Sequence, residues 1–130
     1  MGRVSNSTKV FLFALLLSQT SHAAGKIEHR CGWFANSSPS NAWLQDKDGE
    51  WEISVQGGYQ AKGKWPEFNI DDEAEFVHTN GGSYGYGCVC LGVTTDPARK
   101  RILQIKLVKI ENLTVCRTDK KLKEPDHPPH

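Results

Sequence analysis

One stretch of the chain, residues 79–93 (T-N-G-G-S-Y-G-Y-G-C-V-C-L-G-V), limits the possible folds more than any other. Asn80-Gly81 favours a two-residue hairpin turn, because a type I′ turn needs positive φ at both central positions. The residues from 83 to 93 then predict a strand, in which successive side chains point to opposite faces. One face of that strand carries two tyrosines and two cysteines: Tyr84, Tyr86, Cys88 and Cys90. Each of the two cysteines therefore needs a partner from a distant part of the chain.

The N-terminal residues predict a signal peptide. Residues 1–9 carry two basic residues and no acidic one, and Val10–Leu17 is an unbroken apolar run. That run is too short to cross a hydrocarbon core of about 30 Å as a helix. Small residues at the positions that a signal peptidase reads predict cleavage after Ala23, with cleavage after Ala24 as the alternative. We therefore expect a signal peptide over 1–23 and a mature protein that is periplasmic or secreted and does not span the membrane.

The four cysteines predict two disulfides, because an even number of cysteines behind an export signal meets an oxidising compartment. A bridge between Cys88 and Cys90 has poor geometry within one strand. Cys31 and Cys116 must then divide these two cysteines between them. A hairpin that pairs residues 101–110 with the cysteine strand brings Cys116 nearer to Cys88 than to Cys90. This register favours Cys31–Cys90 with Cys88–Cys116 and leaves the reverse pairing open.

Alternation of apolar and polar residues predicts further strands. Residues 42–45 and 50–55 flank the turn sequence D-K-D-G, and in the second segment Trp51, Ile53 and Val55 share one face. Residues 101–110 also alternate. The predicted buried face of that strand is Leu103, Ile105 and Leu107.

The fold expected from these patterns is mainly β: a small, single-domain antiparallel sheet with at most one short helix, stapled by two disulfides. A helical turn can begin within residues 69–75, where acidic residues suit the first turn of a helix. The disulfide-linked β domain is predicted over 24–117. Residues 118–130 are charged and proline-rich, so they predict a disordered tail.

Four short motifs together resemble a known family. They are Cys31-Gly-Trp-Phe34, the segment from Trp43 to Trp51, Val55-Gln-Gly-Gly-Tyr59, and the segment from Asn80 to Leu91. The chain resembles, over about residues 31–116, the small exported bacterial proteins catalogued as domain of unknown function 4087. The resemblance implies a bacterial envelope protein with two disulfides, and it implies no activity. Gly82 is a difference from the family pattern, since it separates Asn80-Gly81 from the serine and tyrosine that follow.

No catalytic or metal-binding constellation is visible in the sequence. His78 is the only histidine in a segment expected to fold, and it could act as a general base only with a neighbouring acid. The Cys-x-Cys spacing lacks the longer spacer of zinc sites. The tetrad Asp46-Lys47-Asp48-Gly49 begins like a calcium loop but lacks the later ligands. We therefore expect a protein that is not an enzyme and binds no metal or cofactor.

Aromatic side chains are the best candidates for a function. After the signal peptide the chain has 14 basic and 15 acidic residues, a balance that gives no reason to expect a nucleic-acid partner. Ten aromatic residues remain, and most of them can equally fill the core of a small β domain. Six form a predicted binding surface: Tyr84, Tyr86, Trp43, Trp51, Tyr59 and Trp65. The sequence thus predicts a binding module for an envelope or secreted protein, such as an inhibitor or immunity-type protein, with glycan binding as the alternative and a small hydrolase as a weaker one.

Overall fold

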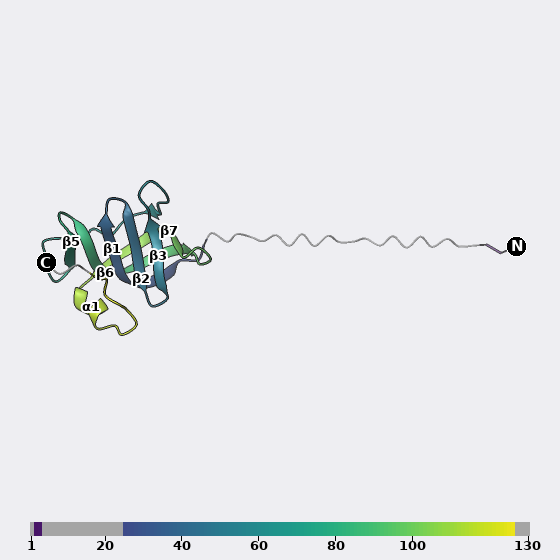
Figure 1. Ribbon diagram of the computed structural model, residues 1–130. Coiled ribbons are helices and arrows are strands. Elements are labelled where there is room, and N and C mark those ends of the chain that lie inside the picture. Colours follow the sequence, from purple (N-terminus) through teal and green to yellow (C-terminus); the bar gives the residue numbers. More distant parts are fainter. Residues whose placement is uncertain (1, 4–24, 127–130) are drawn as a thin grey trace.

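The structure is a computed structural model that describes residues 2–3 and 25–126, so the predicted signal peptide lies almost wholly outside the described residues. The described chain forms seven strands and one short helix (Figure 1). In chain order they are β1 (Glu28–Ser38), β2 (Asn41–Asp46), β3 (Gly49–Ser54), β4 (Lys62–Gly63), β5 (Phe76–Asn80), β6 (Tyr84–Asp96), β7 (Arg101–Glu111) and α1 (Leu113–Arg117). The fold is mainly β, as predicted. Among the described residues, none of the helical structure is long and apolar enough to cross a membrane.

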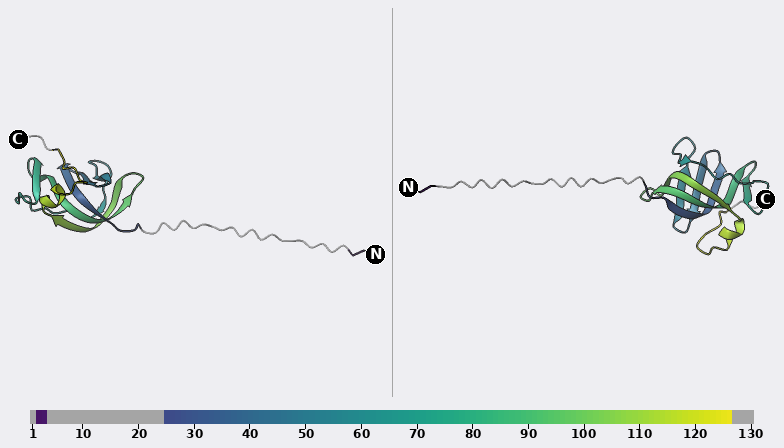
Figure 2. Two further views of the ribbon diagram at one scale, coloured as in Figure 1. Left: turned by 90° about the horizontal axis from the view of Figure 1, so that it is seen from below. Right: turned by 180° about the vertical axis from the view of Figure 1, so that it is seen from behind.

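The sheet closes on itself as a barrel. Its strand order is β4-β7-β3-β2-β1-β6-β5, and an additional pairing of β7 with β6 joins the two halves of this order. Five strands, β1, β2, β3, β7 and β6, therefore form a ring, whose curvature is visible from below in Figure 2. The ring closes through one parallel pair, Glu52 with Arg101, whose side chains also form an ion pair of 2.9 Å. The long pairings are antiparallel, as the sequence predicts, and the short pairings of β7 with β3 and β4 are parallel.

Strand β6 is the longest strand, and three strands pair with it. One edge pairs with β1, while the other pairs first with β5 and then with β7. The hairpin between β5 and β6 was predicted, but its turn differs from the predicted one. Asn80 pairs with Tyr84, and Gly81 and Gly82 both have positive φ. The turn is therefore the three-residue segment 81–83, in which the extra glycine supplies the second left-handed position.

The inner face of the barrel holds the main core. It consists of eleven buried side chains, Phe34, Ala42, Leu44, Trp51, Ile53, Ala61, Val89, Leu91, Val93, Ile102 and Ile105. The predicted face of β3 is confirmed at Trp51 and Ile53, whereas Val55 lies beyond the strand and is exposed.

The predicted buried face of β7 is wrong at two of its three positions. Ile105 is buried, but Leu103 and Leu107 are 40% and 66% exposed. The pairing of β6 with β7 slips by one residue at two places, and each slip leaves an extra residue on β7. A bulge of this kind reverses the facing of every residue beyond it. Ile102 consequently takes the inward position that alternation assigned to Leu103.

A second cluster lies on the outer face of the same strands. It contains Trp33, Ala35, Tyr86, Cys88, Leu113 and Cys116, with Trp43, Val77 and Leu122 packed against it. Helix α1 covers part of this cluster, outside the barrel wall (Figure 1). The helix is held there by the Cys88–Cys116 disulfide, while Cys31–Cys90 links β1 directly to β6. The disulfide pairing favoured by the sequence is therefore the pairing in the structure.

Two further segments differ from their expectations. The turn-forming composition of residues 36–41 (N-S-S-P-S-N) predicts a loop, whereas β1 extends to Ser38. Residues 69–75 form turns and not a helix; the short helix is α1 instead.

Candidate functional site

A row of three side chains crosses the outer face of the barrel. Ala35 on β1 pairs with Trp43 on β2 and with Tyr86 on β6, so all three point outward side by side. Trp33 packs edge-on against the Tyr86 ring, with the ring centroids 5.3 Å apart. Because alanine is small, a hollow opens between the two aromatic side chains.

We call this hollow the Trp43–Tyr86 groove. Its volume is about 190 Å³, and it lies between β2 and the end of β5. It is lined by Ala35, Ser37, Trp43, Thr79, Asn80, Gly85, Tyr86, Pro125 and Asp126. The Asn80 side chain donates a hydrogen bond of 2.8 Å to the Ser37 carbonyl, which fixes β5 against β1 beside the groove. The Thr79 hydroxyl is buried and has no hydrogen-bond partner among the described residues, so the groove also offers a polar group that a ligand can satisfy.

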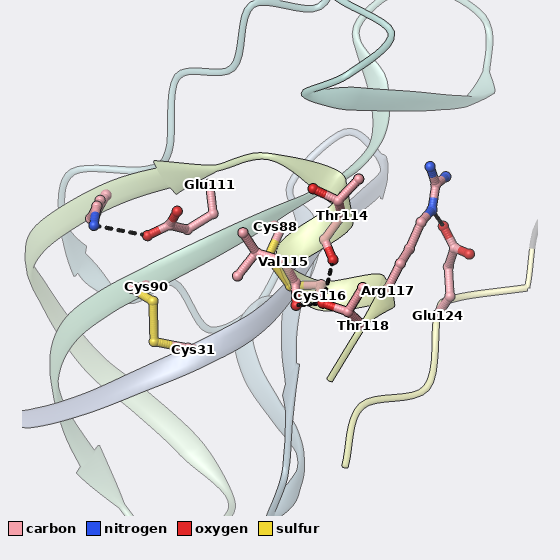
Figure 3. Close-up of a disulfide and its surroundings, with 11 residues drawn as sticks. Cys31, Cys88, Cys90, Glu111, Thr114, Val115, Cys116, Arg117, Thr118 and Glu124 are labelled. Atoms are coloured by element: carbon pink, nitrogen blue, oxygen red, sulfur yellow. Dashed lines mark hydrogen bonds and ion pairs between the residues drawn. A yellow bond between two sulfur atoms is a disulfide. The ribbon is translucent and has the colours of Figure 1, made fainter. Parts of the chain in front are cut away.

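The segment after α1 returns across the outer cluster. We call residues 118–126 the C-terminal strap. Leu122 packs against the outer cluster, and Pro125 and Asp126 line the groove. The Glu124 carboxylate accepts hydrogen bonds from the Arg117 Nε at 2.8 Å and from the Tyr86 hydroxyl at 3.2 Å. Figure 3 shows Arg117 on the helix reaching Glu124 on the returning chain, next to the Cys88–Cys116 disulfide.

The C-terminal strap is the first part of the segment 118–130, for which the sequence predicts a disordered tail. Residues 118–126 contact the domain through the three features just described, whereas residues 127–130 lie outside the described residues. These contacts are not predicted by the sequence, because the segment is charged and rich in proline. One signal was present: Leu122 is an isolated apolar residue within it.

Burial changes the acid–base chemistry of Tyr86. Its side chain is 1% exposed. Burial raises the pKa of Tyr86 to about 12, and the neighbouring Glu124 carboxylate adds to the effect because it disfavours the phenolate. Tyr86 is therefore a neutral hydrogen-bond donor, and its donor group is directed at the strap.

The structure does not bring the other predicted surface residues to this groove. Tyr84 is half-buried near the β5–β6 turn. The Tyr59 hydroxyl donates to the Ile102 carbonyl at 2.7 Å, and Trp65 packs edge-on against Phe34. Of the six candidates, Trp43 and Tyr86 are the two that share a hollow.

Trp51 belongs to the core and carries two cations above its ring. The guanidinium carbon of Arg30 lies 4.0 Å from the ring centroid and the Lys100 nitrogen 4.5 Å from it. Arg30 also hydrogen-bonds three carboxylates, those of Asp46, Asp48 and Glu28. Burial lowers the pKa of Arg30, but these hydrogen bonds outweigh burial and raise the pKa above its ordinary value. This cluster holds the end of the barrel together and leaves Trp51 inaccessible to a partner.

The His78 ring contacts backbone carbonyl groups of two neighbouring segments. Its Nδ1 lies 2.9 Å from the Gly82 carbonyl oxygen, and its Nε2 lies 2.6 Å from that of Ile70. The ring thus connects the β5–β6 turn to the loop before β5. A general base needs a ring nitrogen directed at a substrate, and both nitrogens of His78 face the backbone.

One group of side chains has the composition of a metal site. Ligand atoms of His29, Cys31 and Cys90 lie within 4.8 Å of one another. Both sulfur atoms belong to a disulfide, so they offer no thiolate, which is the form that binds metals. This group therefore does not supply the thiolates that a zinc site needs.

The family model described as "Protein of unknown function (DUF4087)" matches residues 25–123. The chain belongs to this family. The resemblance seen in the four sequence motifs is thereby confirmed. No curated protein and no solved structure matches the chain significantly. The match covers the barrel, both disulfides and the strap as far as residue 123, and it assigns no activity to them.

Proposed function

We propose that this DUF4087 protein is an exported, non-enzymatic binding module. Its target is a protein of the bacterial envelope or a secreted protein, which it holds in the Trp43–Tyr86 groove as an inhibitor or immunity-type protein holds its target. Export is supported by the N-terminal sequence and by two disulfides, which persist in oxidising compartments.

The observation that carries the proposal is the Trp43–Ala35–Tyr86 row, in which Trp43 is partly exposed and the buried Tyr86 forms the floor beside the C-terminal strap. Tryptophan and tyrosine are enriched among the residues that dominate protein–protein binding, because they offer a large contact area for few rotatable bonds. The row lies on three paired strands, and the Cys31–Cys90 disulfide joins two of them. A site built on rigid strands loses little entropy on binding.

Affinity capture from a periplasmic extract tests the proposal. The wild-type protein is compared with Trp43→Ala and with Leu107→Ser, a control at an exposed apolar position of β7 outside the groove. We expect one protein to be captured by the wild type and the control and to be lost with Trp43→Ala. Capture of that protein by all three variants would contradict the groove as its site. Circular dichroism and the non-reducing mass check that each variant is folded with both disulfides.

Glycan binding is the second candidate, and a hollow on the other side of Trp43 supports it. This hollow has a volume of about 300 Å³ and is lined by Ser37, Asn41, Ala42, Trp43, Glu50, Glu52, Ser54 and Val55. A sugar ring can stack on the indole while carboxylates and the amide of Asn41 bind its hydroxyl groups. Retention of the wild type on purified peptidoglycan, with loss in Glu50→Gln and no protein captured from the extract, would replace the first proposal by this one.

A further inference from the structure

The C-terminal strap forms one wall of the groove and places an acidic residue and a proline next to Tyr86. Glu124 places its carboxylate between the Arg117 guanidinium and the Tyr86 hydroxyl. The next residue, Pro125, lines the groove with the two aromatic residues, and Asp126 follows it. An acidic residue that hydrogen-bonds Tyr86 is therefore followed by a proline that forms part of the groove wall.

A groove lined by aromatic side chains can bind a peptide in which an acidic residue is followed by proline. Proline-containing peptides enter grooves lined with Trp and Tyr at a low entropic cost, because proline restricts the free chain to extended conformations. The Arg117 side chain provides the matching cation for a carboxylate, and charge-assisted hydrogen bonds are stronger than neutral ones. Tyr86 supplies a second donor from the floor of the groove.

The strap is held less firmly than the barrel. The described residues 118–126 belong to no strand, and their backbone hydrogen bonds are local, such as Leu122 N to Asp119 O. The ion pair between Arg117 and Glu124 is well exposed, with side chains 44% and 36% accessible, and ion pairs of this kind contribute little to stability. Segments with few buried contacts open at a lower free energy than the core.

We propose that the C-terminal strap is an internal ligand of the groove. The groove binds an extended peptide segment of a partner in which an acidic residue precedes proline, and the strap competes with that segment. This inference rests on the proposed function, since it names the chemistry and the regulation of the same site. Competition follows from occupancy: a site that is open for a fraction of the time binds with an affinity reduced by that fraction.

A labelled synthetic peptide with the sequence of residues 118–130 is the probe, and fluorescence anisotropy is the measurement. The mature wild-type protein is compared with the double variant Leu122→Ala/Glu124→Gln, in which the strap has lost two of its contacts. We expect the double variant to bind the peptide at least tenfold more tightly than the wild type does. Peptides carrying Glu124→Gln or Pro125→Ala should bind the double variant at least tenfold more weakly than the unaltered peptide.

Two results would overturn the inference: equal affinity of the wild type and the double variant, or equal affinity of the unaltered and altered peptides. Hydrogen exchange of the strap amides shows independently that the double variant has opened while β1 and β6 stay protected. Partner capture separates the two proposals. If Trp43→Ala abolishes capture while the double variant captures as the wild type does, the strap inference fails and the binding module stands. If the double variant binds the peptide but no envelope protein is captured, the proposed function fails and the peptide chemistry stands.

Discussion

Strand β6 has two faces that are buried in different ways. Its inner face contributes Val89, Leu91 and Val93 to a core that is enclosed by the barrel wall. Its outer face contributes Tyr86 and Cys88 to a cluster that is covered by α1 and the strap. The inner cluster can be exposed only by opening the barrel, whereas part of the outer cluster can be exposed by moving the strap. We therefore expect the inner cluster to contribute most of the free energy of unfolding and the outer cluster to provide the binding site.

Removal of a large inner side chain should have the largest effect on stability. Leu91 is fully buried, and Leu91→Ala should lower the free energy of unfolding by about 2–5 kcal/mol because it leaves a cavity. Urea denaturation measures the change. The exposed residue Leu107 on β7 is the control, and Leu107→Ala should cost much less. Equal losses from both substitutions would show that the barrel interior is not the main source of stability.

Loss of the Cys88–Cys116 disulfide should make α1 mobile, whereas loss of the Cys31–Cys90 disulfide should not. The paired substitutions Cys88→Ala and Cys116→Ala should destabilise the protein by about 2–4 kcal/mol. They should also free α1, which this bridge ties to β6. Hydrogen exchange of residues 113–117 would then rise. In the matched variant without Cys31–Cys90, α1 should stay protected, and equal exchange of α1 in the two variants would contradict the separate anchoring of the strap region.

A single added methyl group on the inner face of β6 should be costly. A Cβ at Gly87 would lie 2.3 Å from the ring of Phe68, so one of the two must move. Gly87→Ala should destabilise the protein by about 1–3 kcal/mol through overpacking. The matched change Gly81→Ala in the turn meets no atom within 4 Å but is strained by its positive φ. Thermal unfolding of Gly87→Ala, and of its rescue by Phe68→Leu, measures the overpacking, and absence of any rescue would contradict the contact.

The smallest expected effect concerns Tyr86 and the strap at high pH. The folded protein raises the pKa of Tyr86 from 10.0 to about 12, first through burial and then through the Glu124 carboxylate. Between these two pH values the unfolded chain has lost the proton that the folded chain keeps. The stabilisation is therefore complete below pH 10 and is lost as the pH rises towards 12.

Titration of the phenolate absorbance, with Tyr86→Phe as the reference, measures this pKa. In Glu124→Gln the pKa should fall towards 10, because the carboxylate is removed and the strap opens, while the free energy of unfolding at neutral pH changes by less than about 1 kcal/mol. An unchanged pKa would show that the strap does not cover Tyr86 in solution.

Much of the candidate site could not be predicted from local patterns. The sequence placed Tyr86 and Cys88 on one face of β6, and the structure agrees. It did not separate Trp43, which lies on the outer face, from Trp51, which lies in the core, because both occupy alternating strands of similar composition. The facing of each strand is set by its neighbours in the barrel, and those neighbours are distant in sequence.

The sequence by itself determined the β class, the β5–β6 hairpin, and the favoured disulfide pairing, because alternation, glycine turns and cysteine spacing act over short distances or along one strand. Only the tertiary structure decided the closure of the barrel through a parallel pair, the two bulges of β7, and the return of the strap to the groove. Each of these depends on contacts between residues far apart in the chain. Burial and packing select among such contacts, and no local pattern records them.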